Sequence, residues 1–170
     1  IILNGVVFMR HMRPNKVKHK LEHGEIANVV SGKHTTSDII EELGVLGFDA
    51  VWLEAEHGPV DFADIPDLTR ACDLWDMTSI VRVNLNLPGV IYRTLDLGAQ
   101  GIVVPHVNTV EEARAVVEST KFGPIGTRGS YTSRQGLGVE TYFQEANEET
   151  LVIVLIEDII AVENLDEILT

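Results

Sequence analysis

Residues 79–120 read SIVRVNLNLPGVIYRTLDLGAQGIVVPHVNTVEEARAVVEST, and they contain two rounds of one pattern. A short β-branched apolar run at 79–84 precedes a helical segment at 88–98, and a second run at 101–107 precedes a second helical segment at 109–120. Runs that are apolar at both odd and even positions are typical of parallel strands covered on both faces. The stretch therefore predicts two consecutive β/α units of a parallel sheet.

The same alternation continues on either side of this stretch. Apolar runs at 25–30, 48–55 and 150–158 precede helical patterns at 36–47, 62–75 and 161–169, and a helical pattern at 140–149 follows a Gly-rich loop. Helix-start signals support these boundaries, because Pro88 lies near the start of one helix and Thr109 with Glu112 forms a capping box at another. Strands that alternate with helices at this spacing predict an α/β fold.

Two parallel architectures compete for this pattern. A doubly wound nucleotide-binding sheet needs a Gly-rich turn after its first strand, and the turn here, SGKHTTSD at 31–38, holds one glycine and no phosphate-binding loop. A (β/α)8 TIM barrel instead gathers polar residues at the carboxyl ends of several strands, as this sequence does, so we predict the barrel. Because a full barrel takes about 250 residues, the 170 residues predict five or six β/α units and a barrel incomplete at its C-terminus.

The composition is that of an ordinary globular chain, 45% apolar and 23% charged. No segment approaches the roughly 18 apolar residues of a membrane helix, so we expect no membrane span. The lone cysteine, Cys72, excludes a disulfide framework and fits the reducing cytoplasm, where we expect the protein to act. We interpret residues 12–170 as one barrel domain, and residues 1–11 as a tag or an upstream extension before a natural start at Met12.

The formal net charge of −13 is unevenly distributed. Residues 1–24 hold five Lys or Arg and one acid, so the rest of the chain is strongly acidic. An acidic body without a basic stripe argues against nucleic-acid binding, because little positive charge is available to displace counterions from phosphates. The basic segment at 10–20 stays open to two interpretations, a solvated first helix or a small nucleic-acid arm.

Polar residues that can carry chemistry follow the predicted strands. His57, after the strand at 48–55, is either a general base, since the pKa of histidine lies near working pH, or a histidine that satisfies a loop carbonyl. Alternation along a strand places Glu54 and Glu56 on one side and His57 on the other. Arg82 lies among valines and needs an anionic partner, which is either an internal carboxylate or the carboxylate of a substrate.

Two further positions stay open on local pattern alone. Glu157, near the end of the run at 150–158, is either a solvated strand end or a ligand for a cation such as Mg2+, which prefers one or two carboxylates with waters and substrate oxygens. We expect its neighbour Asp158 to cap the next helix. The Gly/Ser/Thr loop at 123–138 contains Arg128, and it is either a carboxylate or phosphate site or a flexible loop.

Several stretches together resemble the HpcH/HpaI aldolase/citrate lyase family, in particular its class II pyruvate aldolase branch, of which 2,4-dihydroxyhept-2-ene-1,7-dioate aldolase is an example. They are GFDAVWLEAEHGP at 47–59, IVRVN at 80–84, LDLGAQGIVVPHVNTVEEA at 95–113, FGPIGTRG at 122–129, and VIVLIED at 152–158 with NLDEIL at 164–169. Each is weak alone, but the set is specific and covers the chain from about residue 17 to residue 170. The resemblance implies the same (β/α)8 barrel.

The resemblance also implies a metal-dependent lyase that cleaves a 4-hydroxy-2-oxo acid to pyruvate and an aldehyde, through a pyruvate enolate stabilised by Mg2+, Mn2+ or Co2+. It implies that His57 is catalytic, with Asp96 as its acidic partner. It implies that Arg82 steadies the carbonyl or enolate oxygen, and that Glu157 binds the metal with a second ligand expected beyond residue 170. The implied partners are small molecules and further copies of the chain, which form hexamers in the family.

The sequence departs from the family pattern at Glu54, where an aspartate is usual, and at His106, where an apolar residue is usual. We expect Glu54 and Glu56 to support the site, and Arg82, Arg128 and His106 to contact the substrate. Two alternatives to the aldolase stay open. One is an altered barrel that binds a 2-oxo acid or a metal without turnover, and the other is a related acyl-thioester lyase.

Overall fold

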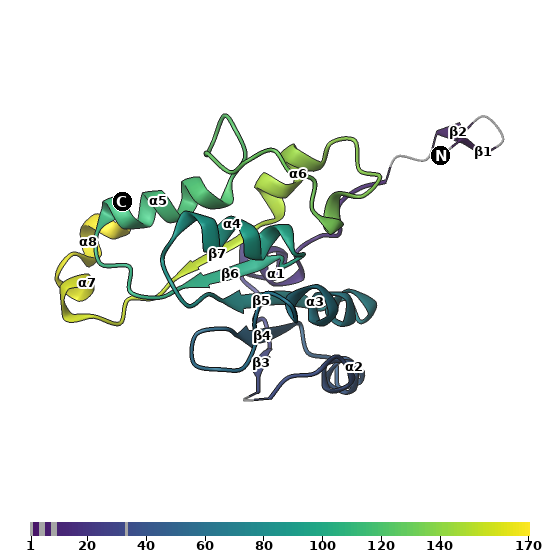
Figure 1. Cartoon of the computed structure of the whole chain (residues 1–170), viewed down its shortest axis with the longest axis horizontal. Helices are drawn as coiled ribbons and strands as arrows, with labels where there is room; N and C mark the ends of the chain where they lie inside the picture. The colour runs from purple at the N-terminus through teal and green to yellow at the C-terminus, as the bar shows by residue number, and fades with distance from the viewer. Residues whose placement is uncertain (1, 4–5, 8–9, 33) are drawn as a thin grey trace.

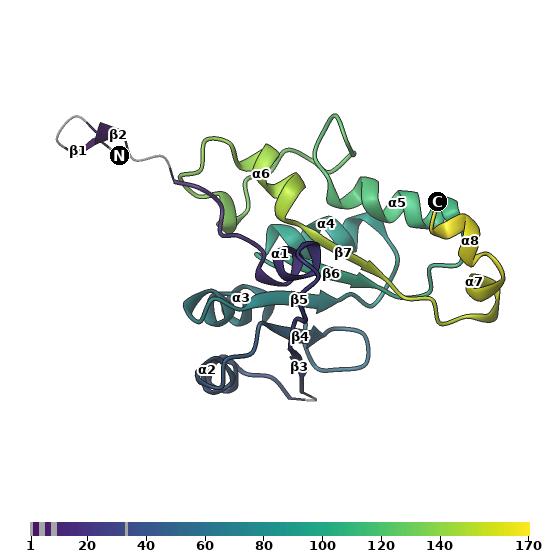
Figure 2. The ribbon, with the colours of Figure 1, turned by 180° about the vertical axis from the view of Figure 1, so that it is seen from behind.

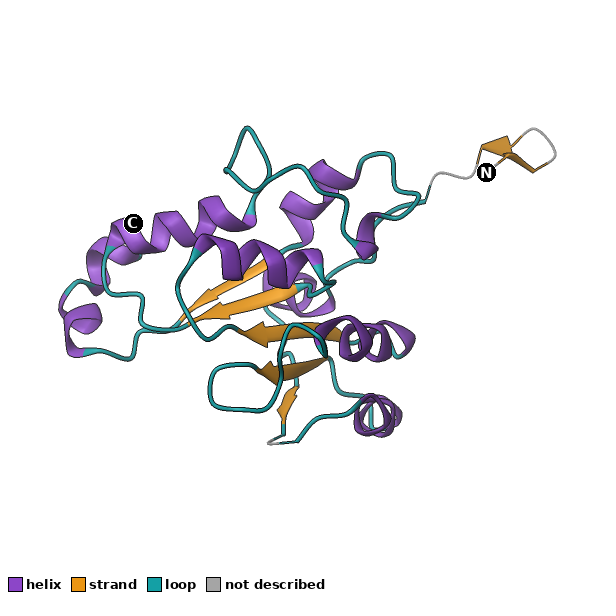
Figure 3. Ribbon diagram, viewed as in Figure 1, coloured by secondary structure: helices purple, strands orange, loops and turns teal. Residues whose placement is uncertain are grey.

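The main sheet is parallel, and its strands lie side by side in the order in which the chain makes them. The computed structural model describes residues 2–3, 6–7, 10–32 and 34–170, and its five-stranded sheet has the order β3-β4-β5-β6-β7 (Figures 1 and 3). The strands are β3 (Val29–Ser31), β4 (Ala50–Glu54), β5 (Thr78–Arg82), β6 (Gly101–Val104) and β7 (Leu151–Val154). A doubly wound sheet would reverse its order at a switch point. The chain instead winds in one direction and forms a partial barrel, which confirms the predicted fold class.

Helices cover one face of this sheet and bury the larger core against it. They are α2 (Ser37–Val45), α3 (Ile65–Leu74), α4 (Pro88–Asp96) and α5 (Val110–Thr120) (Figure 1). Three helices follow them in the chain: α6 (Tyr142–Glu149), which packs in a separate cluster with Met12 and Phe122, then α7 (Ile159–Glu163) and α8 (Leu165–Ile168). Alternate strand residues such as Leu53 and Ile102 meet helical residues such as Ile40 and Ile91 in the larger core. Cys72 is buried there, and burial raises the pKa of its thiol to about 12. No helix in the described ranges is long and apolar enough to cross a membrane.

The other face of the sheet packs against the first helix, α1 (Lys16–Glu22). Figure 2 shows α1 on this side, where Val17 meets Ala50, Ile80 and Val103 of three adjacent strands. These strand residues alternate with those of the larger core, as the two-residue repeat of a strand requires. This face is therefore the interior of the partial barrel.

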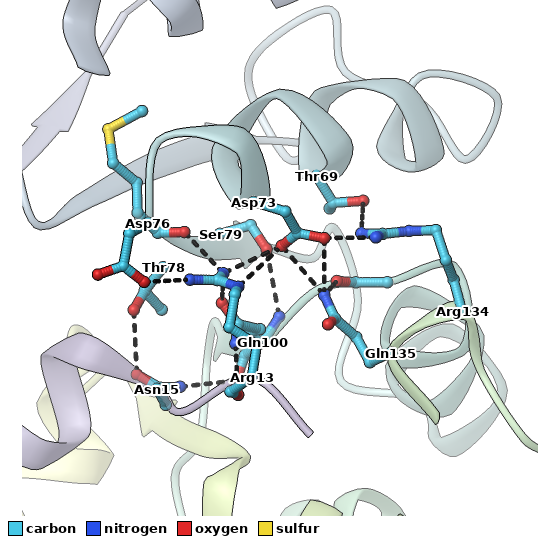
Figure 4. A network of polar contacts seen from close by, with 12 residues as sticks. Arg13, Asn15, Thr69, Asp73, Asp76, Thr78, Ser79, Gln100, Arg134 and Gln135 are labelled. Carbon is cyan, nitrogen blue, oxygen red and sulfur yellow. Dashed lines mark hydrogen bonds and ion pairs between the residues drawn. The ribbon is translucent and has the colours of Figure 1, made fainter. Parts of the chain in front are cut away.

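The amino-terminal edge of the sheet is closed by the chain that enters α1. Asn15, the buried N-cap of α1, donates its side-chain amide to the backbone oxygens of Gln100 and Glu149, which lie just before β6 and β7. Arg13 reaches Asp73 at the end of α3 with Nε at 3.2 Å, within the polar network of Figure 4. The open end of the sheet is thus the carboxyl-terminal one.

The basic segment at 10–20 forms part of this closure. Lys16 and Lys20 lie 3.3 and 2.8 Å from the carboxylate of Asp49, which is almost fully buried. His19 lies 3.1 Å from the carboxylate of Glu149. Of the two interpretations of this segment, the structure shows the helix, and its charges pair with acids of the chain itself.

The first residues form a separate element. β1 (Ile2–Leu3) and β2 (Val6–Val7) pair with each other in the antiparallel sense (Figure 1). Contacts with the main body begin close to Met12, which is buried and whose backbone N–H donates to Glu145 at 2.6 Å. The interpretation of residues 1–11 as a tag or an upstream extension stays a prediction.

Candidate active site

Polar residues from four strands gather at the carboxyl-terminal edge of the sheet. Glu54 is the last residue of β4 and pairs in register with Arg82, the last residue of β5. His106 comes two residues after β6 and Glu157 three residues after β7. Because the strands are parallel, these four residues lie at the same mouth of the partial barrel. The other edge is closed by α1, so this mouth is the candidate active site.

Arg82 is held between two glutamates. Its Nε donates to the Oε1 and Oε2 atoms of Glu54 at 2.9 and 2.8 Å, and its Nη2 lies 2.7 Å from Oε2. Its Nη1 lies 3.0 Å from Oε2 of Glu56. The bond with Glu54 raises the pKa of Arg82, so the guanidinium stays charged. Of the two partners expected for Arg82, the structure shows the internal carboxylate, and two of the five N–H groups of a guanidinium stay outside these contacts.

The carboxylate of Glu54 binds the backbone of the turn that follows it as well as Arg82. Its Oε1 accepts hydrogen bonds from the backbone N–H groups of Glu56 and His57 at 2.9 and 3.0 Å. Gly58 makes this turn possible, because a Cβ at that position would lie 2.6 Å from the backbone oxygen of Glu54. Burial alone would raise the pKa of Glu54, but the hydrogen bonds from Arg82 and the two amides outweigh burial and lower the pKa to about 2. The carboxylate that fixes this corner is therefore ionised at neutral pH.

His57 projects into solvent at the rim of the mouth. Its side chain is 75% exposed, whereas that of Glu56 is 9% exposed, and the two approach to 3.9 Å between Nε2 and Oε2. Both glutamates contact Arg82, while His57 points outward. Because β4 ends at Glu54, the turn after the strand sets the positions of Glu56 and His57, and the expected alternation along a strand does not extend to them. The histidine has a backbone fixed by Glu54 and an imidazole that is open to a bound molecule.

His106, which follows β6, lies at the mouth with an unusual backbone conformation. Its φ is +53°, which is uncommon for a residue other than glycine. Its backbone N–H donates to Oε1 of Glu157 at 3.0 Å, and its Nδ1 lies 3.0 Å from Oδ2 of Asp158. The bond with Asp158 raises the pKa of His106. Asp158 lies at the N-cap position of α7, as predicted, but its carboxylate binds His106 and Asn108 and makes no cap hydrogen bond.

The carboxylates at the mouth offer hard oxygen ligands for a divalent cation. Glu157 is 35% exposed, whereas Glu56 is 9% exposed and its Oε2 is already paired with Nη1 of Arg82 at 3.0 Å. An accessible carboxylate such as Glu157 suits a cation of the Mg2+ type, which takes one or two carboxylates and completes its shell with water and substrate oxygens. Among the described residues, no group of three His, Cys, Asp or Glu is arranged to hold a metal ion. The residues present therefore fit a divalent cation as a partial set of ligands.

Asp96 lies away from this mouth, contrary to the expected pairing with His57. It is the last residue of α4, five residues before β6 begins, and so it lies at the amino-terminal edge of the sheet. Its Oδ1 accepts a hydrogen bond from Nη2 of Arg128 at 2.6 Å. The prediction of a His57–Asp96 pair is wrong within this chain, because α4 carries the chain back along the sheet before it reaches Asp96.

Arg128 is buried and makes its contacts within the protein. Its side chain is 2% exposed. The guanidinium carbon lies 4.4 Å from the centre of the Phe122 ring, a cation–π contact that adds to the ion pair with Asp96. The expected substrate contact of Arg128 is therefore wrong. The residue anchors its loop to the end of α4.

Trp52 contributes a contact to the site that the sequence analysis did not anticipate. Its Nε1 donates to Oε2 of Glu54 at 3.2 Å, and the guanidinium carbon of Arg82 lies 6.0 Å from its ring centre. Residues two apart on a strand share a face. That spacing was the signal that could have revealed the contact.

The sequence and the fold match those of a known family. The family model for HpcH/HpaI aldolase/citrate lyase matches residues 31–170. The chain belongs to the HpcH/HpaI aldolase/citrate lyase family. A crystal structure of an HpcH/HpaI family protein from Burkholderia cenocepacia J2315 is similar with a TM-score of 0.83 and 27% identity, over 91% of this chain and 64% of that one.

Two curated aldolases are among the proteins that resemble the chain in sequence. A 2-dehydro-3,6-dideoxy-6-sulfogluconate aldolase of Pseudomonas putida is 39% identical over 132 residues, which are 75% of this chain and 51% of that protein. A 2-keto-3-deoxy-L-rhamnonate aldolase of Salmonella gallinarum is 31% identical over 166 residues, which are 95% of this chain and 62% of that protein. The chain therefore spans less than two thirds of the length of each relative.

Proposed function

We propose that this chain carries the catalytic mouth of a metal-dependent aldolase, which cleaves a 4-hydroxy-2-oxo acid into pyruvate and an aldehyde. The observation that carries the proposal is the charged guanidinium of Arg82, held by Glu54 and Glu56 at the open mouth with Glu157 close enough to act on it electrostatically. Membership of the HpcH/HpaI family and the two aldolases among the relatives support the reaction class.

The proposed reaction breaks one carbon–carbon bond. A base takes the proton of the C4 hydroxyl, the C3–C4 bond breaks, and the aldehyde leaves with its new carbonyl. The electron pair of the broken bond forms the enolate of pyruvate, and a proton returned to C3 completes pyruvate. Negative charge develops on the enolate oxygen, so the site must hold positive charge at that atom before the reaction begins.

Arg82 is the group that meets this requirement. Three of its N–H groups are engaged by Glu54 and Glu56, which fix the plane of the guanidinium, and the two others are free of these contacts. Such a preorganised donor costs no reorganisation when charge develops. Arg82 therefore orients the 2-oxo group and stabilises the enolate oxygen.

His57 is the group proposed to move the proton. Its imidazole is exposed at the rim, while its backbone N–H is fixed by Glu54. It takes the proton from the C4 hydroxyl and returns it to C3. His106, held by Asp158 beside Glu157, is proposed to contact the far end of the substrate.

Glu157 is the residue proposed to hold the divalent metal, because its carboxylate is accessible at the mouth. The cation, when bound, supplies Lewis-acid stabilisation of the negative charge that develops on the 2-oxo acid. Mg2+, Mn2+ and Co2+ are the candidates, because carboxylate oxygens suit these ions.

Release of pyruvate tests the proposal. The protein is incubated with a panel of 4-hydroxy-2-oxo acids, and pyruvate is measured with lactate dehydrogenase in the presence of Mg2+, Mn2+ or Co2+ and after chelation. We expect cleavage that chelation abolishes and added metal restores. Binding of pyruvate without any cleavage would instead favour a binding module. Release of pyruvate only from thioester substrates, together with an acetyl thioester, would favour the acyl-thioester lyase.

We further propose that the protein acts in the cytoplasm as a homo-oligomer, a hexamer as the family resemblance implies. Light scattering coupled to size exclusion tests the assembly. A mass near six times that of the chain is the expected result, and a monomer at all concentrations would contradict it.

A further inference from the structure

Trp52 lies on the inner face of the partial barrel, directly beneath the mouth. In the register of the sheet it lies between Ser31 of β3 and Ile80 of β5. Its side chain packs against the apolar cluster that contains Val17, Ala50 and Ile80. The indole is therefore anchored from below by apolar contacts, whereas its polar edge faces the carboxylate above it.

The polar edge of the indole reaches the same oxygen that holds the arginine. Oε2 of Glu54 accepts from Nε1 of Trp52 at 3.2 Å and from Nε of Arg82 at 2.8 Å, and Nη2 of Arg82 lies 2.7 Å away. The backbone N–H groups of Glu56 and His57 hold Oε1 of the same carboxylate. Its Oε2 has a different environment, because the guanidinium that binds it ends a side chain with several rotatable bonds. The indole N–H adds a donor on a rigid, anchored ring, and this donor fixes Oε2 where the guanidinium binds.

We infer that Trp52 is a positioning residue of the site, which acts on Arg82 through Glu54. The inference rests on the proposed function, in which Arg82 stabilises the enolate oxygen. Among the described residues, the indole N–H donates to Glu54 and not to His57 or Glu157. The guanidinium carbon of Arg82 also lies 6.0 Å from the ring centre. Loss of the N–H donor alone, with an aromatic ring kept in place, therefore acts through the carboxylate of Glu54.

The replacement Trp52→Phe tests the inference, because it keeps an aromatic ring in the apolar cluster and removes the N–H donor. We expect kcat for aldol cleavage to fall about tenfold, the usual consequence of losing one hydrogen bond to a charged group, with KM changed less. Trp75→Phe is the matched control, because Trp75 ends α3 at the other edge of the sheet. We expect no change in kcat for that variant.

A double-mutant cycle separates positioning from general loosening of the core. In a Glu54→Ala background the indole has no carboxylate to hold, so Trp52→Phe is expected to change kcat less than about twofold there. Equal fold losses in the wild-type and Glu54→Ala backgrounds would overturn the inference. So would an unchanged kcat for Trp52→Phe in an active protein, with the proposed function left standing.

Fluorescence keeps the inference testable if the Glu54→Ala variant fails to fold. Because the chain has two tryptophans, Trp75→Phe leaves Trp52 as the only indole. Pyruvate added with Mg2+ or Mn2+ is expected to change its emission along the same saturation curve as the activity. Emission that does not respond to pyruvate in an active enzyme would overturn the inference, whereas a wild-type protein without any cleavage would overturn the proposed function and this inference together.

Discussion

Glu54 joins the arginine, the indole and the turn at the mouth through one carboxylate. Its pKa is about 2 in the folded protein and about 4.5 in an unfolded chain, so its ionised form stabilises the fold. That contribution is present above pH ~4.5 and is lost as the pH falls towards ~2. We expect Glu54→Gln to lower the free energy of unfolding by about 2 kcal/mol at pH 7, and by clearly less at pH 2.5.

Urea unfolding at the two pH values measures this difference. Glu41→Gln is the control, because Glu41 is exposed on α2 and should show no difference at either pH. A loss for Glu54→Gln that is as large at pH 2.5 as at pH 7 would contradict the role of the ionised carboxylate.

His57 should be needed for turnover but not for folding, because its side chain is exposed at the rim. We expect His57→Ala to lower kcat by roughly 10²–10⁴-fold, the usual share of a general base, with little change in the unfolding midpoint. The control is His23→Ala, an exposed histidine at the end of α1. Undiminished turnover in His57→Ala would remove His57 from the mechanism.

Residues of the site could be predicted from sequence where they end a strand. Glu54, Arg82 and Glu157 follow or close β-branched runs, and parallel strands bring such positions together. Asp96 and Arg128 could not be placed in this way. The position of Asp96 depends on the length and direction of α4. The burial of Arg128 is not indicated by any local pattern in the sequence.

The crossing of α2 and α3 depends on one glycine. A Cβ on Gly44 would lie 2.3 Å from Cγ of Trp75. Alanine favours a helix over glycine by about 1 kcal/mol, so Gly44→Ala would stabilise α2 in isolation. In the protein we expect it to destabilise by about 2 kcal/mol through overpacking, as measured by urea unfolding. Trp75→Ala in the same chain should recover part of the loss, and a stabilised Gly44→Ala variant would contradict this packing.

The loop at 121–129 is held on α4 by the pair of Arg128 and Asp96. Arg128→Met would leave the carboxylate without its partner, and we expect a loss of about 3 kcal/mol in unfolding free energy. Amide hydrogen exchange should rise across the loop. Arg114→Met, on the exposed side of α5, is the control. A loss no larger than in the control would mean that the pair does not anchor the loop.

At the scale of elements, strands were easier to predict than the closure of the amino-terminal edge of the sheet. The runs at 79–84 and 101–107 correspond to β5 and β6, and Thr109 caps α5 as predicted, with its side chain accepting from the backbone N–H of Glu112. This closure depends on Asn15. Its side-chain amide donates hydrogen bonds to the backbone oxygens of Gln100 and Glu149, which lie 85 and 134 residues further along the chain. Pairing over such separations leaves no periodic signal in the sequence.

At the scale of the whole molecule, the charged residues at the two edges of the sheet have different roles. At the amino-terminal edge, cations such as Lys20 and Arg13 meet acids of the chain and close the partial barrel. At the carboxyl-terminal edge, Arg82 lies between the carboxylates of Glu54 and Glu56, with the accessible Glu157 close by. We place the reaction at this second edge, because its charges come from the ends of several strands that meet at the mouth.

The exchange of the methyl hydrogens of pyruvate in deuterated water, followed by proton NMR, tests this placement most directly, because it requires the enolate and no aldehyde. We predict exchange that depends on Mg2+, Mn2+ or Co2+, stops on chelation, and falls by roughly 10²–10³-fold in Arg82→Ala, the usual cost of losing a preorganised donor to an oxyanion. Absence of exchange with all three metals would contradict the placement of the reaction at this mouth.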